Sequence, residues 1–199
     1  MKISKTKERV LNSALDIVSE SGLELLTIGK LAFSTGMSKS GLFAHFKSKE
    51  KLQLDVLRHA AEIFTDTVLK PSLKKPRGIP RIRAIYENWN RWADSELPGG
   101  CVFIAASFEY DDRPGPVRDC LYDLQSKWID SLSLIADHAV KAGVFKPSTD
   151  CEQFAYELFS LMIGYHHFQR MLTSDRAKSM QDTAFENLIS RHQTEVVKT

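Results

Sequence analysis

The stretch from Thr27 to Leu52, TIGKLAFSTGMSKSGLFAHFKSKEKL, decides the fold that we predict for this chain. Thr27 can cap a short helix, because its hydroxyl can accept a hydrogen bond from a first-turn amide that has no other partner. Gly36 ends that helix, and Ser38 can cap a second helix that runs to about Phe46. Two short helices joined by a glycine-containing turn predict a helix-turn-helix.

The second of these helices is the part expected to read DNA. In a helix-turn-helix it enters the major groove, and its N-terminal residues face the bases. Here those residues are Ser38, Lys39, Ser40 and Gly41. Lys39 can donate to guanine acceptors, the serines can serve base or phosphate, and the glycine lets the backbone approach closely. We expect Leu42 and Phe46 to face the core, and His45 and Lys49 to contact phosphates.

A helix before this pair, from Lys5 to Glu20, is expected to support it, because two helices this short cannot bury enough surface alone. Its apolar residues recur on one face at spacings of one, three and four: Val10, Leu11, Ala14, Leu15 and Val18. The cations at its front either lie near a phosphate backbone or form a solvated tail, and both interpretations stay open: Lys2, Lys5, Lys7 and Arg9.

These residues resemble the N-terminal DNA-binding domain of the TetR family of bacterial transcriptional regulators. The pattern T-I-x-x-L-A, followed by G-M-S-K-S-G-L-F-A-H-F-K-S-K-E-K-L, matches the family's spacing from residue 6 to about residue 55. The family usually has tyrosine at the position of Phe43, so a phosphate contact from its hydroxyl is absent or replaced here. Phe43 then either touches a thymine methyl group or packs. The resemblance implies DNA-facing positions for Thr27, Lys39, Phe43, His45 and Lys49.

Composition and charge agree with a helical regulator. The chain has 199 residues, of which 43% are hydrophobic and 26% charged. Residues 1–60 carry a net charge of +4 and residues 61–199 a net charge of −2, as expected if the N-terminal part faces phosphates. No apolar run approaches the ~20 residues that cross a bilayer, and the N-terminus has no signal-peptide pattern, so we expect a cytoplasmic protein.

The rest of the chain is predicted to be helical, which makes the fold class all-α. We expect residues 1–50 to form the helix-turn-helix domain and residues 51–199 a helical regulatory and dimerisation domain. An apolar segment at 101–110 could pass for a strand, but its length and setting favour a buried helix. The basic segment from Lys70 to Arg83 is either a linker or a DNA neighbour. The helices expected here span about 49–69, ending before Pro71, then 79–95, 101–110, 117–142, 150–172 and 177–196.

An apolar repeat near the C-terminus indicates a packed helix pair. Phe154, Leu158, Leu161, Tyr165, Phe168 and Leu172 follow one another at four-three-four-three-four spacing. Dimers of TetR-like proteins use such a pair, and two recognition helices ~34 Å apart would require an imperfectly palindromic operator. The predicted dimer interface comprises Phe154, Leu158, Leu161, Gly164, Tyr165, Phe168 and Leu188.

Several residues of the helical body either form ordinary core or line a ligand cavity: Trp89, Trp92, Phe103, Phe108, Tyr110, Trp128, Phe159 and His166. Regulators that resemble this chain bind a small, often apolar molecule, so we expect a ligand-responsive repressor whose ligand is small and apolar. Cys101 is a weaker candidate redox sensor, because no neighbouring cation would lower its pKa.

Other classes of protein fit the sequence less well. No His-x-x-x-His or Glu-x-x-His pair, nucleophile elbow, P-loop or dinucleotide motif supports an enzyme, a metal or a cofactor. The widely spaced Cys101, Cys120 and Cys151 match neither a disulfide framework nor a zinc site. A non-specific DNA-packaging protein would be expected to carry a larger positive charge over its whole length.

Overall fold

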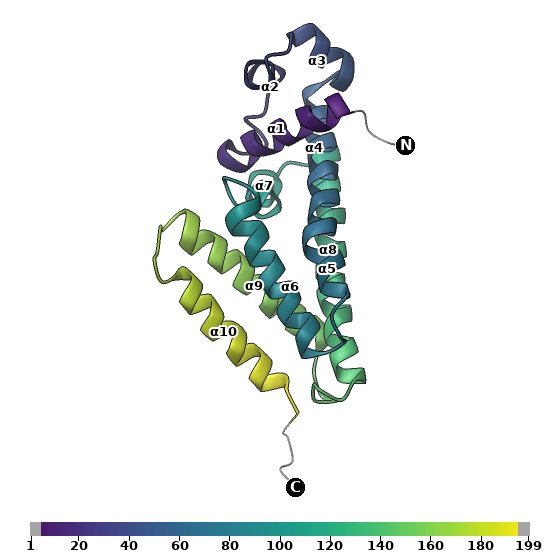
Figure 1. The fold of residues 1–199 in the computed structure, drawn as a ribbon, viewed down its shortest axis with the longest axis vertical. Helices are drawn as coiled ribbons and strands as arrows, with labels where there is room; N and C mark the ends of the chain where they lie inside the picture. Colours follow the sequence, from purple (N-terminus) through teal and green to yellow (C-terminus); the bar gives the residue numbers. More distant parts are fainter. Residues whose placement is uncertain (1–4, 195–199) are drawn as a thin grey trace. The chain divides into compact units, whose positions relative to one another are not determined.

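The computed structural model describes residues 5–194 as a succession of helices with no strand in that range (Figure 1). The predicted all-α fold with a helix-turn-helix near the N-terminus is confirmed. Two π-helical segments, η1 (Thr65–Leu69) and η2 (Trp92–Glu96), accompany ten α-helices in these residues. The α-helices are α1 (Lys5–Ser21), α2 (Ile28–Thr35), α3 (Lys39–Phe46), α4 (Lys49–Phe64), α5 (Lys70–Leu73), α6 (Ile79–Arg91), α7 (Val102–Tyr110), α8 (Pro116–Lys141), α9 (Cys151–Arg170) and α10 (Ala177–His192).

Residue contacts divide the chain into two compact units that interleave in sequence. The first unit comprises Met1–Asp66 and Arg91–Leu124, and the second comprises Thr67–Asn90 and Gln125–Thr199. Helix α7 therefore belongs to the same compact unit as the helix-turn-helix. The division into functional domains at residues 50 and 51 stays a prediction.

Several predicted helix ends differ from the structure. The helix that begins at Lys49 does not stop before Pro71 but continues through η1 and α5 to Leu73. Pro71 lies just after the π-helical segment η1, and this local departure from the α-helical hydrogen-bond pattern accommodates a residue without an N–H inside the continuous helix. The helix predicted for 79–95 is α-helical only to Arg91 and then becomes π-helical. Helix α10 ends at His192, and residues 195–196 lie outside the described range.

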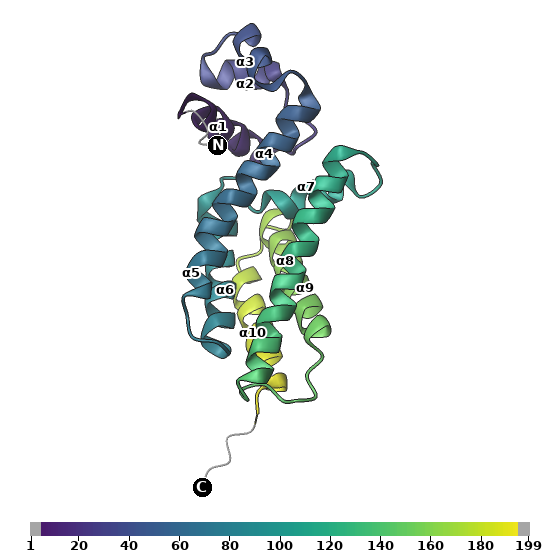
Figure 2. The same ribbon diagram turned by 90° about the vertical axis from the view of Figure 1, so that its right-hand side faces the viewer.

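The first unit is built on the apolar face of α1, as predicted. Val10, Leu11, Ala14, Leu15 and Val18 are all buried, and α1 packs against α2, α4 and α7. Helices α2 and α3 contribute their inner residues, Leu31, Ala32, Leu42 and Phe46, to the same core. Figure 2 shows α1, α2 and α3 grouped at the start of α4. The two short helices thus obtain from α1 and α4 the buried surface that they lack alone.

A backbone contact joins the end of α1 to the turn before α7. The Gly99 amide donates to the Ser19 hydroxyl at 3.1 Å, and both residues are buried. A Cβ added to Gly99 would lie 1.6 Å from the Ser19 carbonyl oxygen, which is backbone and cannot rotate away. The glycine is therefore required by this close approach of two chain segments 80 residues apart.

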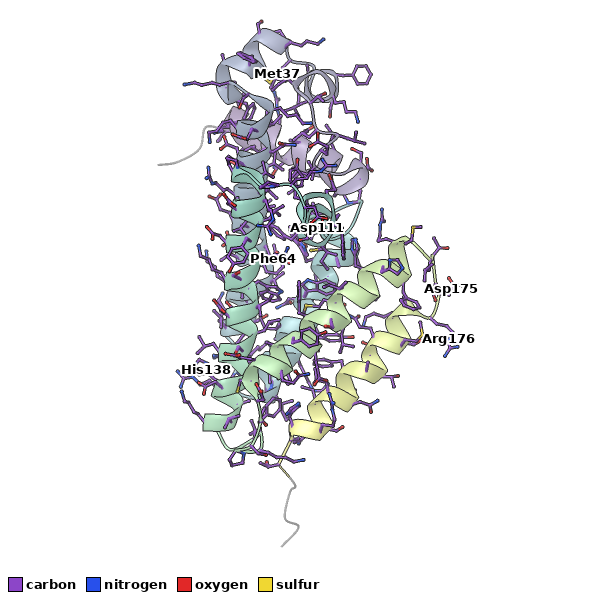
Figure 3. The ribbon with its side chains drawn as sticks, turned by 180° about the vertical axis from the view of Figure 1, so that it is seen from behind. Met37, Phe64, Asp111, His138, Asp175 and Arg176 are labelled. Atoms are coloured by element: carbon purple, nitrogen blue, oxygen red, sulfur yellow. The ribbon has the colours of Figure 1, made fainter. Side chains whose placement is uncertain are left out.

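The second unit contains the helix pair α9 and α10, which pack along each other. Asp150 caps α9 by accepting hydrogen bonds from the amides of Glu152 and Gln153, both at 3.0 Å. At the other end of the pair, Figure 3 shows Asp175 and Arg176 in the connection between the two helices.

The Gly99 contact yields a stability prediction. We expect Gly99→Ala to lower the free energy of unfolding by about 3 kcal/mol, because the added methyl group forces two backbone segments apart. Gly29→Ala is the matched control, since its added Cβ meets only ordinary contacts at 3.8 Å or more within a helix, where alanine is favoured over glycine. Urea unfolding followed by circular dichroism measures both, and equal stability of the two variants would contradict the prediction.

Candidate DNA-binding site

Side-chain caps shape the helix-turn-helix, as the sequence predicts. The Thr27 hydroxyl accepts a hydrogen bond from the Lys30 amide at 3.1 Å, at the start of α2. Gly36 ends α2 in the left-handed conformation with φ of 66°, which glycine adopts without a side-chain clash. Ser38 then caps α3 by accepting from the Gly41 amide at 3.1 Å. Figure 3 shows Met37 at the turn between the two helices.

The N-terminal turn of α3 presents polar groups to solvent. Ser38, Lys39 and Ser40 are exposed, Gly41 is partly exposed, and Leu42 and Phe46 are buried as expected. A Cβ on Gly41 would lie 3.1 Å from the Ser38 hydroxyl oxygen, so glycine also leaves room for the cap. Thr27 and His45 are exposed as well. The arrangement can place hydrogen-bond donors and one long cation against base edges in a major groove.

Two aromatic side chains of this region are exposed. Phe43 is 57% exposed on α3, so it is not part of the core. Phe33, on α2, is 94% exposed and was not singled out from the sequence. Its position could have been predicted, because Ile28, Leu31 and Ala32 define the inner face of α2 and Phe33 falls outside it.

Lys49, expected on a phosphate, has a partner inside the chain. Its Nζ lies 2.7 Å from Oε1 of Glu24, in the connection between α1 and α2. The other oxygen of Glu24 accepts a hydrogen bond from the Tyr110 hydroxyl at 2.8 Å and lies 3.6 Å from the guanidinium of Arg113. The hydrogen bonds from Lys49 and then Tyr110 hold the pKa of Glu24 below its usual value, so this carboxylate is ionised at neutral pH.

Two further residues hold the same connection in place. The Glu109 carboxylate accepts hydrogen bonds from the backbone amides of Leu23 and Glu24, at 3.0 and 2.8 Å. The buried Gln53 amide donates to the Leu23 carbonyl and to the Tyr110 hydroxyl. Sequence reasoning missed Glu24, Gln53 and Glu109. One feature of the sequence pointed to a buried hydrogen-bond network here: the polar Gln53 follows the apolar Leu52 in a helix that was expected to be partly buried.

The cationic side chains at the N-terminal end of α1 differ in their ion pairing and exposure. Lys7 forms an ion pair with Asp55 of α4 at 2.8 Å, so its charge is used within the first unit. Lys5 and Arg9 are exposed, and Lys2 lies outside the described residues.

The residues predicted to line a ligand cavity are distributed over both units. In the first unit, Trp92 and Phe103 stack at 6.1 Å, and both meet the ring of Phe64 edge-on. Tyr110 is committed to Glu24, and Phe108 is 66% exposed. In the second unit, Trp89 packs against Tyr165, Trp128 is buried, and Phe159 and His166 are partly buried. Cys101 is buried, and burial raises the pKa of its thiol, which disfavours a reactive thiolate.

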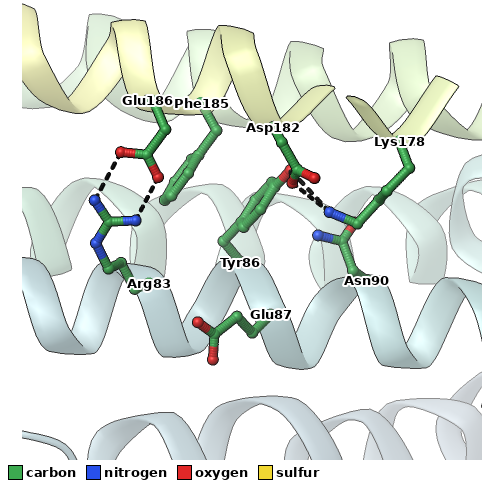
Figure 4. Close-up of a pocket in the computed structure, with 8 residues that line it drawn as sticks. All are labelled: Arg83, Tyr86, Glu87, Asn90, Lys178, Asp182, Phe185 and Glu186. Atoms are coloured by element: carbon green, nitrogen blue, oxygen red, sulfur yellow. Dashed lines mark hydrogen bonds and ion pairs between the residues drawn. The ribbon is translucent and has the colours of Figure 1, made fainter. Parts of the chain in front are cut away.

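A polar pocket of about 310 Å³ lies between α6 and α10 in the second unit (Figure 4). The rings of Tyr86 and Phe185 stack at 3.9 Å, and the Tyr86 hydroxyl donates to Asp182 at 2.6 Å. The buried amide of Asn90 has no hydrogen-bond partner. This pocket contains none of the eight residues predicted to bind ligand; it is lined by Arg83, Tyr86, Glu87, Asn90, Lys178, Asp182, Phe185 and Glu186.

The residues predicted for the dimer interface separate into two groups. Phe154, Leu158, Tyr165 and Leu188 are buried within this single chain. Leu161, Gly164 and Phe168 line a groove of about 180 Å³ between α9 and α10, together with Met180. Three of the six residues of the four-three repeat, Phe154, Leu158 and Tyr165, are thus buried within one chain, and a contact between chains stays a prediction.

Comparison with known proteins assigns the family. The sequence profile described as "Bacterial regulatory proteins, tetR family" matches residues 10–56, and the profile described as "Tetracyclin repressor-like, C-terminal domain" matches residues 78–185. The exposed α3 and its caps thus lie in a helix-turn-helix DNA-binding protein, and the chain belongs to the TetR family of bacterial transcriptional regulators. No curated protein shows significant sequence similarity to it.

Solved structures share the fold over nearly the whole chain. A TetR transcriptional regulator from Chloroflexus aurantiacus is 24% identical, with a TM-score of 0.81 and coverage of 94% of this chain and 93% of the other. SCO4454, a TetR-family regulator from Streptomyces coelicolor, is 19% identical, with a TM-score of 0.80 and coverage of 94% and 96%. A regulator from Saccharomonospora viridis in complex with choline is 18% identical, with a TM-score of 0.82 and coverage of 96% and 100%.

None of the helices within residues 5–194 combines the length and the apolar composition that a membrane-spanning helix requires. Within residues 5–194, no group of three or more His, Cys, Asp or Glu side chains is arranged to hold a metal ion.

Proposed function

We propose that this TetR-family regulator is a homodimeric repressor that binds a palindromic operator and is released from it by a small ligand. The observation that carries the proposal is the exposed N-terminal turn of α3, capped by Ser38 and set on a buried base of α1 and α4. Its polar residues match the type and position of side chains that read base edges in the major groove.

The contact residues of this proposal divide by role. Ser38, Lys39, Ser40 and Gly41 face the bases, with Phe43 beside them. Thr27, His45 and Lys49 contact the phosphate backbone, which positions the protein but carries no sequence information directly.

Specific binding is the first expectation to test. We expect the protein to bind DNA from upstream of its own gene at least about 10³-fold more tightly than scrambled DNA of the same length at physiological salt. Fluorescence anisotropy with the two labelled duplexes measures this ratio. Equal affinity for both duplexes would contradict operator recognition.

Lys39 provides a residue-level prediction. If its ammonium group donates to guanine, Lys39→Ala should cost about 1 to 3 kcal/mol of binding free energy and relax the preference at one position of each half-site. Lys127→Ala, which removes an exposed lysine from α8 in the other unit, is the matched control and should leave binding unchanged. Anisotropy against operators substituted at single positions separates the outcomes. A uniform loss over all sequences would assign Lys39 to a phosphate instead.

An apolar surface of the second unit supports a dimer through α9 and α10. Phe168 and Met180, which line the groove between these helices, are 42% and 38% exposed. Met171 and Leu172, which directly follow α9, are 73% and 51% exposed. A Cβ added to Gly164 meets no atom within 4 Å, so packing inside this chain does not require glycine there. Glycine in a helix interior lowers stability by about 1 kcal/mol relative to alanine. Close approach of a second chain would explain why glycine is present at this position.

The dimer is tested by placing a charge on this surface. We expect sedimentation at micromolar concentration to give the mass of two chains for the wild type and of one chain for Phe168→Glu, because a carboxylate would be desolvated in an apolar interface. Tyr122→Glu, at a 66% exposed position on α8, is the control and should remain dimeric. A monomeric wild type, or a dimeric Phe168→Glu with native helicity, would exclude this interface.

The ligand of the proposed repressor has two candidate locations. The rings of Phe64, Trp92 and Phe103 form an apolar cluster in the first unit, which suits the apolar ligand expected from the sequence. The pocket beside Asn90 would instead suit a polar one. The choline complex of the Saccharomonospora viridis protein supports binding of a small molecule by this fold. Such a ligand must prefer the DNA-free state by a few kcal/mol to release the operator.

A further inference from the structure

Lys49, which is expected to bind DNA, forms an ion pair with the carboxylate of Glu24 in the same unit. Both side chains are partly exposed, at 40% for Lys49 and 43% for Glu24. A DNA phosphate and a carboxylate carry the same sign of charge and accept hydrogen bonds from an ammonium group in the same way. Glu24 therefore occupies, in the absence of DNA, a position on Lys49 that a phosphate oxygen could take.

Glu24 is held in this position by the remainder of the first unit. Its second oxygen accepts from the Tyr110 hydroxyl of α7, and its backbone amide donates to Glu109 of the same helix. Burial raises the pKa of Tyr110, so its hydroxyl keeps the proton that it donates. A hollow of about 320 Å³ beside the network is lined by Glu24, Lys49, Tyr110 and Arg113, among others. Two residues of α7 thus fix a negative charge next to the start of α4.

We propose that Glu24 is an internal competitor of the DNA backbone for the Lys49 ammonium group, and that Tyr110 on α7 determines how strongly it competes. The inference rests on the proposed function, because it assumes that Lys49 contacts a phosphate. It assigns to Glu24 an autoinhibitory role in DNA binding, and it makes the hydrogen bond from α7 part of the control of affinity.

Electrostatics distinguishes this role from simple positioning of Lys49. Each cation that neutralises a phosphate releases counterions and steepens the fall of affinity with salt by about 0.9 in the log–log slope. A lysine already paired with a carboxylate releases fewer counterions. A competitor therefore lowers both the affinity and the salt slope, whereas a positioning residue would raise the affinity.

The central experiment measures operator binding of Glu24→Gln by anisotropy at several salt concentrations. Glutamine keeps the size of the side chain and can still accept from Tyr110, but it removes the charge that pairs with Lys49. We expect binding about two- to fivefold tighter at low salt, the range of an exposed ion pair, and a salt slope steeper by about 0.9 per chain. Glu20→Gln makes the same charge change at an exposed position on α1 and should leave the salt slope unchanged.

Two further variants test the partners of Glu24. Lys49→Gln should weaken binding more in the Glu24→Gln background than in the wild type, because the ammonium group is freed only there. Tyr110→Phe should tighten binding by less than Glu24→Gln does, and should add nothing to it in the double variant. Tyr122→Phe, which removes an exposed tyrosine hydroxyl from α8, serves as the control. Thermal melts followed by circular dichroism confirm that each variant is folded.

The outcomes separate failure of this inference from failure of the proposed function. If the wild-type protein does not distinguish operator from scrambled DNA, both the proposed function and this inference are wrong. Wild-type protein that does so, while Glu24→Gln binds equally or more weakly with an unchanged salt slope, would overturn the competitor role alone. Lys49→Gln without effect in either background would also overturn it, because no phosphate contact would then exist for Glu24 to oppose.

Discussion

The DNA-reading helices depend on the connection between α1 and α2, which the Glu109 carboxylate holds by accepting hydrogen bonds from two consecutive backbone amides. Gly22 permits this contact, because a Cβ at its position would lie 2.6 Å from the Glu109 carboxylate. Helices of eight residues cannot set their own orientation. Their placement relative to α1 follows from this connection, from the buried face of α1 and from the start of α4.

The same connection also places a negatively charged side chain next to the surface that is expected to bind DNA. An acidic side chain, Glu24, lies between a cation expected to meet DNA and a tyrosine of the helical body. Its ion pair is partly exposed and therefore weak, which is compatible with the proposed displacement by DNA. Exposed pairs of this kind add little to stability, which agrees with the proposed role in tuning affinity. The contacts of Glu109, and that of Gln53 with Leu23, are hydrogen bonds to backbone groups.

Much of the helix-turn-helix could be predicted from sequence, because its signals act over a few residues. The caps at Thr27 and Ser38, the stop at Gly36 and the buried Leu42 and Phe46 all lie where local rules placed them. Predictions that depended on distant residues were less complete. Four of the seven residues assigned to a dimer interface are buried inside one chain, because an apolar stripe indicates burial without indicating which helix covers it.

By itself, the sequence determined the all-α class, the caps, the position of the recognition turn and the family to which the chain belongs. These follow from short-range hydrogen bonding, helical periodicity and side-chain spacing. Only the tertiary structure decided that Gly99 meets the Ser19 carbonyl, that Glu109 holds the amides of Leu23 and Glu24, and that Lys49 has a carboxylate partner. The two backbone contacts join residues at least 80 positions apart, and the ion pair joins residues 25 positions apart. No local pattern encodes such pairings, because they exist only once the helices have packed.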